Sequence, residues 1–209
     1  IQAAIGLAMA LSAGVAAGGL VHHFPWARRM FYPLLVVSQT IPVIVLAPLL
    51  VIWFGYGMLP KLIVVTLACF FPIAVAVVDG LDGADPKKLK LLRSMGAGPA
   101  QQFRLVKVPT ALVSLFTGLR VAATYGVMAS VIAEWMGADA GLGVYIVRSA
   151  RSFRTDQVFA GILLITLYSV GLFQLVDLLR RKALPWERYE RESPAGNLPH
   201  KTEVGQNII

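Results

Sequence analysis

Residues 85–109 read DPKKLKLLRSMGAGPAQQFRLVKVP, a basic stretch between two long apolar runs. Asp85 followed by Pro86 is typical of a helix start, because an Asp side chain caps free N–H groups and proline suits the first turn. Over residues 87–95, leucine and methionine recur with helical spacing among basic residues, which predicts an amphipathic helix. Gly96 suits its C-terminal end.

A second short helix is expected after this corner. Gly98 and Pro99 open it, residues 100–108 form it, and Pro109 ends it before the next apolar run. An amphipathic helix lying on anionic lipid would explain the lysines equally well. It would not explain the glycine-rich corner and the second helix, which favour a helix-turn-helix that projects from a membrane and inserts into a partner.

Outside this polar stretch the chain is apolar enough to cross a membrane several times, since a spanning helix needs about 20 apolar residues. In the first apolar run, Gly14 and Gly18 predict the close approach of another helix. We therefore expect an all-α, polytopic transmembrane helical bundle over residues 1–182, with a cytoplasmic loop at 83–109 and a cytoplasmic tail at 183–209. The five expected spans are 1–21, 31–54, 61–81, 110–136 and 157–179.

The composition agrees with a membrane protein. Of 209 residues, 57% are hydrophobic and 14% are charged, and the mean hydropathy is +0.70. A soluble domain would be about 25% charged, so an ordinary soluble enzyme and a disordered chain are excluded. The single cysteine, Cys69, excludes an internal disulfide framework. The net charge of +8 lies in loops, which favours a membrane protein over a nucleic-acid-binding one.

Basic residues predict the orientation, because loops rich in Lys and Arg stay in the cytoplasm. Thirteen basic residues lie in the segments after the first, third and fifth spans, against four on the other side. The C-terminus is therefore expected inside. Five spans then put the N-terminus outside, and because the chain begins without methionine in apolar sequence, we expect a further helix ahead of it.

The second expected span contains three prolines and should be kinked or locally unwound. Between the prolines lies its most polar tripeptide, Ser38-Gln39-Thr40. These side chains either make hydrogen bonds between helices or line a polar pathway, and both interpretations stay open. The prolines are Pro33, Pro42 and Pro48.

Arg120 and Glu134 lie in the fourth span, where a charge is costly unless it faces a cavity or a partner. We favour a salt bridge from each to a neighbouring helix or a lipid headgroup. In the alternative, Arg120 attracts an anionic substrate and Glu134 contacts a partner outside. Tyr125 of the same span is a further candidate for the lining of a pathway.

The remaining titratable residues fit structural roles. The adjacent His22 and His23 do not share a helix face, so they do not predict a metal site. Asp79 and Asp82 lie at a span end, where solvation explains them. The glycine-rich segment 137–143 lacks the lysine of a phosphate-binding loop, so no nucleotide site is expected in this chain.

The polar stretch carries a family resemblance. KLLRSMGA at 90–97, nine residues from Ala97 to Leu105, and VKVP at 106–109 together resemble the EAA loop of ABC importer permeases. That pattern is Glu-Ala-Ala, three residues, Gly, nine residues, then Ile-x-Leu-Pro. The spacing matches throughout, and the departure is that Lys-Leu-Leu replaces Glu-Ala-Ala.

Three further stretches are similar to the nitrate/sulfonate/taurine-type permeases. They are Ile41-Pro42 through Pro48, the turn WFGYG at 53–57, and Ala133-Glu134 followed by GLG at 141–143. The resemblance implies that the five spans are the second to sixth helices of a six-helix permease in a bacterial cytoplasmic (inner) membrane.

The resemblance also implies partners. Such permeases form dimers, a homodimer here, receive substrate from an extracytoplasmic solute-binding protein, and dock their loop into a separate ATP-binding subunit. ATP and Mg would be bound by that ATPase, so this chain would be no enzyme and would hold no cofactor. The coupling helix would be 96–103. The residues implied in ATPase coupling are Lys90, Arg93, Gly96, Ala97, Gly98, Pro99, Gln101, Phe103 and Pro109.

The candidate pathway residues are Ser38, Gln39, Thr40, Arg120, Tyr125 and Glu134. The subfamily handles small anions such as nitrate, sulfonates and taurine, and its relatives carry thiamine precursors, so both substrate classes stay open, with Arg120 favouring anions slightly. An ATPase-independent channel or secondary transporter is the alternative, although it would need no docking loop. A membrane-embedded enzyme would need paired His or Asp motifs, and the sequence has none.

Overall fold

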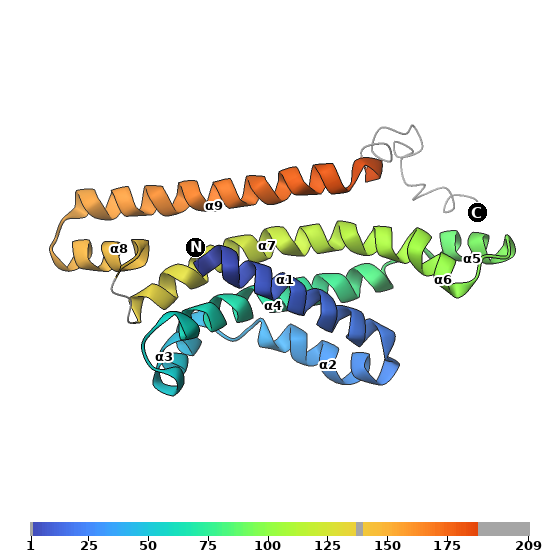
Figure 1. The fold of residues 1–209 in the computed structure, drawn as a ribbon, viewed down its shortest axis with the longest axis horizontal. Coiled ribbons are helices and arrows are strands. Elements are labelled where there is room, and N and C mark those ends of the chain that lie inside the picture. The colour runs from blue at the N-terminus through green and yellow to red at the C-terminus, as the bar shows by residue number, and fades with distance from the viewer. Residues whose placement is uncertain (1, 137–139, 188–209) are drawn as a thin grey trace, which may run out of the picture.

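The computed structural model describes residues 2–136 and 140–187 and is all-α over these residues, as predicted. The long helices α1, α4, α7 and α9 run roughly along one direction, with α5 and α6 at one end and α8 at the other (Figure 1). We call these the basic end and the α8 end. The elements are α1 (Gln2–His23), α2 (Pro25–Ser38), α3 (Val43–Phe54), α4 (Met58–Asp82), α5 (Pro86–Ser94), α6 (Pro99–Gln102), the π-helical turn η1 (Phe103–Lys107), α7 (Val108–Trp135), α8 (Leu142–Arg151) and α9 (Thr155–Ala183).

Four helical stretches are long and apolar enough to cross a membrane, and α2 with α3 makes a fifth if the bent pair is one span. The protein is therefore a multi-pass membrane protein. The second span differs from the prediction of 31–54, because helix begins at Pro25 and breaks at residues 39–42, where the chain bends by 99°. Residues 188–209 of the expected tail lie outside the described residues.

The break lies at one proline of the three. Pro42 is the N-cap of α3 and has an extended backbone, and helix resumes at Val43. Pro33 and Pro48 stay inside α2 and α3 without a break. The expectation of an unwound second span is thus confirmed, at one position.

The core is formed where α4 packs between α1 and α7, and Ile73 and Cys69 of α4 are fully buried there. The expected contact face of α1 is confirmed. A Cβ atom built on Gly14 would lie 2.8 Å from Cγ2 of Ile73, and one on Gly18 would lie 2.7 Å from Cβ of Val77. Glycine at these positions lets the backbones of α1 and α4 approach closely.

α9 is the least buried of the long helices. It lies along α7 (Figure 1) and buries only Gly161 and Val176 within the described chain. The rest of its surface is rich in exposed leucine, isoleucine and phenylalanine. Such a surface suits lipid or another protein subunit.

Candidate translocation pathway and coupling segment

The first helix of the polar stretch forms as expected. The Asp85 side chain caps α5 by accepting a hydrogen bond of 2.8 Å from the Lys87 backbone N–H. At the other end Gly96 has φ +81°, a conformation that favours glycine. Its N–H donates to the Arg93 carbonyl and that of Ala97 to the Leu92 carbonyl, which is the Schellman pattern of helix termination.

The second helix differs from the prediction. Helix begins at Pro99, with Gly98 as its cap, and the Gly98 N–H donates to Oε1 of Gln101 at 3.0 Å. It does not end at Pro109, which lies in the first turn of α7, so Pro99–Trp135 is one continuous helical stretch. The π-helical turn ahead of Pro109 explains this. There the Val108 N–H donates to the carbonyl five residues earlier, and this wider register gives room for a proline.

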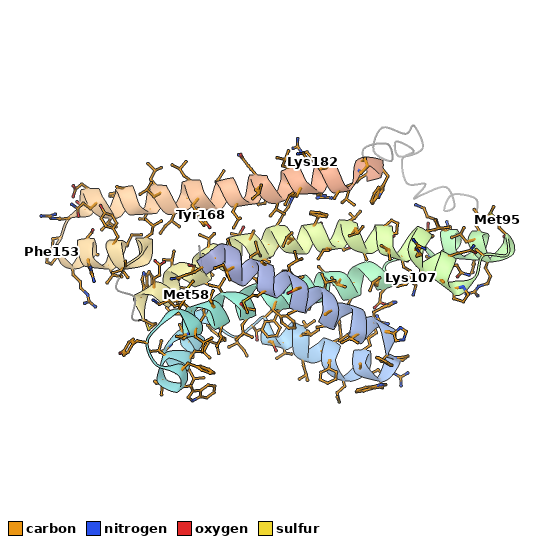
Figure 2. All side chains as sticks on the ribbon, viewed as in Figure 1. Met58, Met95, Lys107, Phe153, Tyr168 and Lys182 are labelled. Atoms are coloured by element: carbon orange, nitrogen blue, oxygen red, sulfur yellow. The ribbon has the colours of Figure 1, made fainter. Side chains whose placement is uncertain are left out.

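α5 and α6, which we call the projecting pair, leave apolar side chains in solvent at the basic end. None of the α5 residues is buried, and Met95 at its tip is 74% exposed (Figure 2). Leu91, Phe103 and Leu105 are also exposed. Of the residues expected in coupling, Ala97, Gly98 and Pro109 are half-buried and the other six are exposed: Lys90, Arg93, Gly96, Pro99, Gln101 and Phe103.

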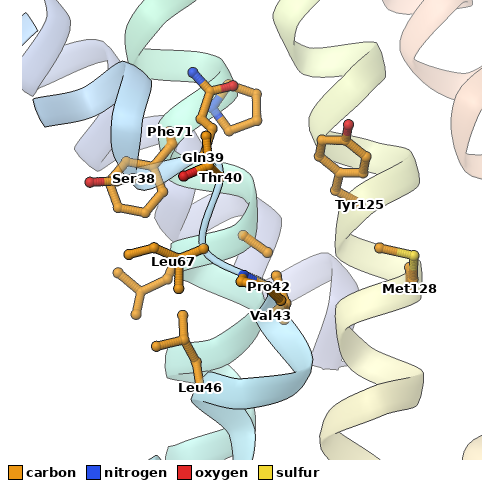
Figure 3. A pocket seen from close by; sticks show the side chains of 13 residues that line it. Ser38, Gln39, Thr40, Pro42, Val43, Leu46, Leu67, Phe71, Tyr125 and Met128 are labelled. Atoms are coloured by element: carbon orange, nitrogen blue, oxygen red, sulfur yellow. The ribbon is translucent and has the colours of Figure 1, made fainter. Parts of the chain in front are cut away.

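Four of the six candidate pathway residues line one cavity of about 250 Å³. Ser38, Gln39 and Thr40 come from the break between α2 and α3, and Tyr125 lies across from them on α7 (Figure 3). Phe71 of α4 adds an aromatic ring to the lining. The break ahead of Pro42 thus places this polar tripeptide at a cavity.

The cavity offers hydrogen bonds but no charge. The hydroxyls of Ser38 and Thr40 donate to the Leu34 and Val37 carbonyls at 2.6 and 2.7 Å, so their lone pairs are left for a ligand. Within the described chain the Gln39 amide and the Tyr125 hydroxyl make no hydrogen bond. Every residue of the lining is uncharged.

Arg120 does not line this cavity. Its guanidinium pairs with the Asp177 carboxylate of α9 and lies 5.3 Å from the ring centroid of Phe173. Asp177 also accepts from Nε of Arg181 at 2.9 Å. This is the salt bridge to a neighbouring helix that we favoured. Asp177 was not predicted as the partner, although an acidic residue inside the span 157–179 is a signal of an internal ion pair.

Glu134 also lies apart from the cavity. Its Oε2 accepts from the Gly143 N–H at 2.7 Å, so the carboxylate caps the first turn of α8 from the end of α7. A Cβ atom on Gly141 would lie 2.3 Å from the carboxylate carbon of Glu134, so glycine is needed for this approach. Within the described chain this contact is a helix cap, and not the salt bridge that we favoured for Glu134.

A polar hollow of about 580 Å³ opens at the α8 end. Arg148 and Arg154 line it, and there Oγ of Ser149 lies 3.2 Å from Oε1 of Gln157. Its lining is mainly polar, and it lies at the end opposite the projecting pair.

Asp79 and Asp82 are exposed, as expected at a span end, but solvation alone does not explain them, because both also have partners in the fold. Asp82 accepts from Nδ1 of His22 at 2.6 Å and from Arg28 at 2.7 Å, and Asp79 accepts from the Tyr32 hydroxyl at 2.8 Å. These contacts join α1, α2 and α4 at the basic end. Their partners are 47 to 60 residues away in the chain, so no local pattern could reveal them.

Comparisons with known proteins agree with this geometry. The family described as binding-protein-dependent transport system inner membrane component matches residues 8–185. The chain is 40% identical to the formylaminopyrimidine transport permease protein ThiX of Halalkalibacterium halodurans, over 88% of this chain and 74% of that protein. It is 31% identical to the putative aliphatic sulfonates transport permease protein SsuC of Bacillus subtilis, over 88% of this chain and 67% of that protein.

A solved structure shares the fold. The crystal structure of an amino acid ABC transporter with histidines matches with a TM-score of 0.66 at 15% identity, over 87% of this chain and 90% of that chain. The arrangement of helices is therefore one already seen in an ABC transporter.

Proposed function

The chain belongs to the family of binding-protein-dependent transport system inner membrane components, as an ABC importer permease of the nitrate/sulfonate/taurine type, and from this premise we propose how it works. It forms the pathway for a small solute across the cytoplasmic membrane, and a separate ATPase drives it through the projecting pair. The observation that carries the proposal is this pair itself, a capped helix and a glycine corner that hold apolar side chains in solvent at the basic end.

The exposed chemistry of the projecting pair supports docking into a protein cleft. Leu91, Met95 and Phe103 supply apolar anchors, and Lys90 and Arg93 supply a basic rim. The Schellman turn at Gly96 makes the corner rigid, so a push on α5 is passed on rather than absorbed. ATP and Mg are bound and hydrolysed by the partner, and the EAA-like loop 83–109 is the contact.

The rest of the chain has matching assignments. Residues 1–182 form the transmembrane domain, with the basic end and the C-terminus in the cytoplasm. The cavity at Ser38–Thr40 belongs to the pathway, and a second copy of the permease completes it. The hollow with Arg148 and Arg154 faces outward and receives acidic groups of the solute-binding protein.

For the substrate we propose an uncharged, planar heterocycle of the kind named for the 40% identical relative, in place of the anion that Arg120 suggested. Arg120 is already neutralised by Asp177, and the cavity holds no cation for a sulfonate. The amide, hydroxyls and aromatic rings of the cavity lining suit a flat molecule that stacks on the rings and forms hydrogen bonds with the polar groups.

The test is co-purification of the tagged chain with an ATP-binding subunit in detergent. Gly96→Asp and Ala97→Glu place a negative charge at the corner, and Phe153→Asp places the same charge at the 92% exposed tip of the α8 end (Figure 2). We expect the ATPase to be lost from both corner variants and kept by the Phe153 control. A wild-type chain that expresses well without any ATPase would favour the channel or secondary transporter instead.

A further inference from the structure

We infer that His22 is a positioning residue that braces the joint between the projecting pair and the membrane helices. The inference rests on the proposed function, in which an ATPase displaces α5 and α6. It starts from three groups at the basic end: Asp82 of α4, His22 of α1, and Lys107, the last residue of η1.

One tautomer of the His22 ring satisfies both of its contacts. Nδ1 lies 2.6 Å from the Asp82 carboxylate, which can only accept, so Nδ1 carries a proton and donates it. Nε2 lies 3.1 Å from Nζ of Lys107, an ammonium that can only donate, so Nε2 offers a lone pair. The ring thus links the Lys107 amine to the Asp82 carboxylate, each at its own nitrogen.

The joint is the one π-helical turn in the described part of the chain. η1 lies between α6 and α7, and single π-helical turns inside helices are rare and frequently mark functional sites. In the proposed function, this turn receives the push on α6. Lys107 ends the turn and reaches out of it to His22, so the contact ties the joint to a different helix.

The elements on the other side of the brace are tied to one another. α1 and α4 approach closely at Gly14 and Gly18, as described above. Arg28 of α2 binds the other oxygen of Asp82 at 2.7 Å, so α2 joins the same carboxylate. A displacement of Lys107 is thus passed through His22 and Asp82 to α1, α4 and α2. It does not depend only on the π-helical turn η1 that leads into α7.

The brace can be tested by hydrogen exchange of the purified permease in lipid nanodiscs. We expect the amides of residues 103–107 to exchange about tenfold faster or more in His22→Leu and Lys107→Met, as expected when a hydrogen bond to a charged group is lost. Lys107→Arg keeps a donor and should restore protection. Tyr32→Phe is the matched control, because it removes a 2.8 Å hydrogen bond at the same end that does not involve η1.

Unchanged exchange in His22→Leu and Lys107→Met would overturn the brace. Equal loss of protection in Tyr32→Phe would also overturn it, since the effect would then come from general loosening of the basic end.

Transmission can be tested in the complex with its ATPase by measuring two spin-label distances before and after adding ATP with vanadate. Labels at Lys87 and Leu178 follow the projecting pair, and labels at Met9 and Phe159 follow the membrane helices; all four side chains are exposed. In the wild type both distances should change. In His22→Leu the first change should persist while the second falls by about half or more.

A full second change in His22→Leu would overturn the role of His22 in transmission. A wild-type complex in which neither distance changes would contradict the proposed function and the transmission with it. The exchange experiment decides the brace separately, because it needs no ATPase.

Discussion

Replacing Asp177 by leucine tests how α9 is held in the bundle. α9 buries only two residues against the rest of the described chain, so the ion pair between Asp177 and Arg120 carries an unusual share of its docking. The substitution leaves the Arg120 guanidinium facing apolar surroundings without its anion. Arg181 loses a partner as well, but its side chain is 71% exposed and the loss there is small.

The magnitude follows from burial. Removing one partner of a fully buried pair costs about 3–5 kcal/mol. Here the Arg120 and Asp177 side chains are 28% and 18% exposed, so the pair is not fully buried. Polar contacts between membrane helices average about 0.6 kcal/mol and reach about 1.7. We therefore expect Asp177→Leu to lower the free energy of unfolding by about 2 kcal/mol.

The assay is unfolding in mixed micelles by increasing the fraction of sodium dodecyl sulfate, followed by circular dichroism. The double variant with Arg120→Leu removes both charges and should recover more than half of the loss, since two leucines pack well between helices. Asp156→Leu, at the exposed first turn of the same helix, should cost less than about 1 kcal/mol. Strictly additive losses from the two single substitutions would refute the reasoning, because an interacting pair cannot be additive.

Three further outcomes follow from the structure. Gly18→Leu should destabilise the bundle by about 1–3 kcal/mol in the same assay, because its Cβ would overlap Val77, whereas Gly19→Leu, with open space around it, should have little effect. Arg148→Glu should weaken association of the solute-binding protein in surface plasmon resonance, with a smaller effect from Arg151→Glu, which lies outside the hollow. Tyr125→Phe should raise the KM of uptake about 3- to 10-fold by removing one hydrogen-bonding group from the cavity, and an unchanged KM would take Tyr125 out of the pathway.

Local signals in the sequence predicted much of this architecture. Hydropathy located the spans, because a helix in lipid must satisfy its own backbone and so needs a long apolar run. The cap at Asp85 and the corner at Gly96 were equally readable, since each depends on residues within one turn. The tripeptide at Ser38 was correctly singled out as unusual, and the structure places it at a cavity.

The predictions from sequence failed where contacts between distant parts of the chain, or an unusual helical turn, outweighed the local preference of a residue. Pro109 should end a helix, but a π-helical turn absorbs it and the helix continues. Asp82 reads as a solvated helix end until the fold brings His22 and Arg28 against it. Arg120 suggested an anion site because its partner Asp177 comes from a different helix, 57 residues further along. The packing of several helices decides which cavity a polar residue faces. The sequence pattern of one helix holds no information about that packing.

The most direct test of the central claim is uptake into proteoliposomes that contain the permease with its co-purified ATPase. The vesicles are oriented with the basic end inside and loaded with either ATP or ADP, and labelled formylaminopyrimidine or taurine is presented outside with the solute-binding protein. We predict uptake with ATP, none with ADP, and none with ATP for Gly96→Asp. Equal uptake with ATP and ADP would contradict the account and identify a transporter that works without an ATPase.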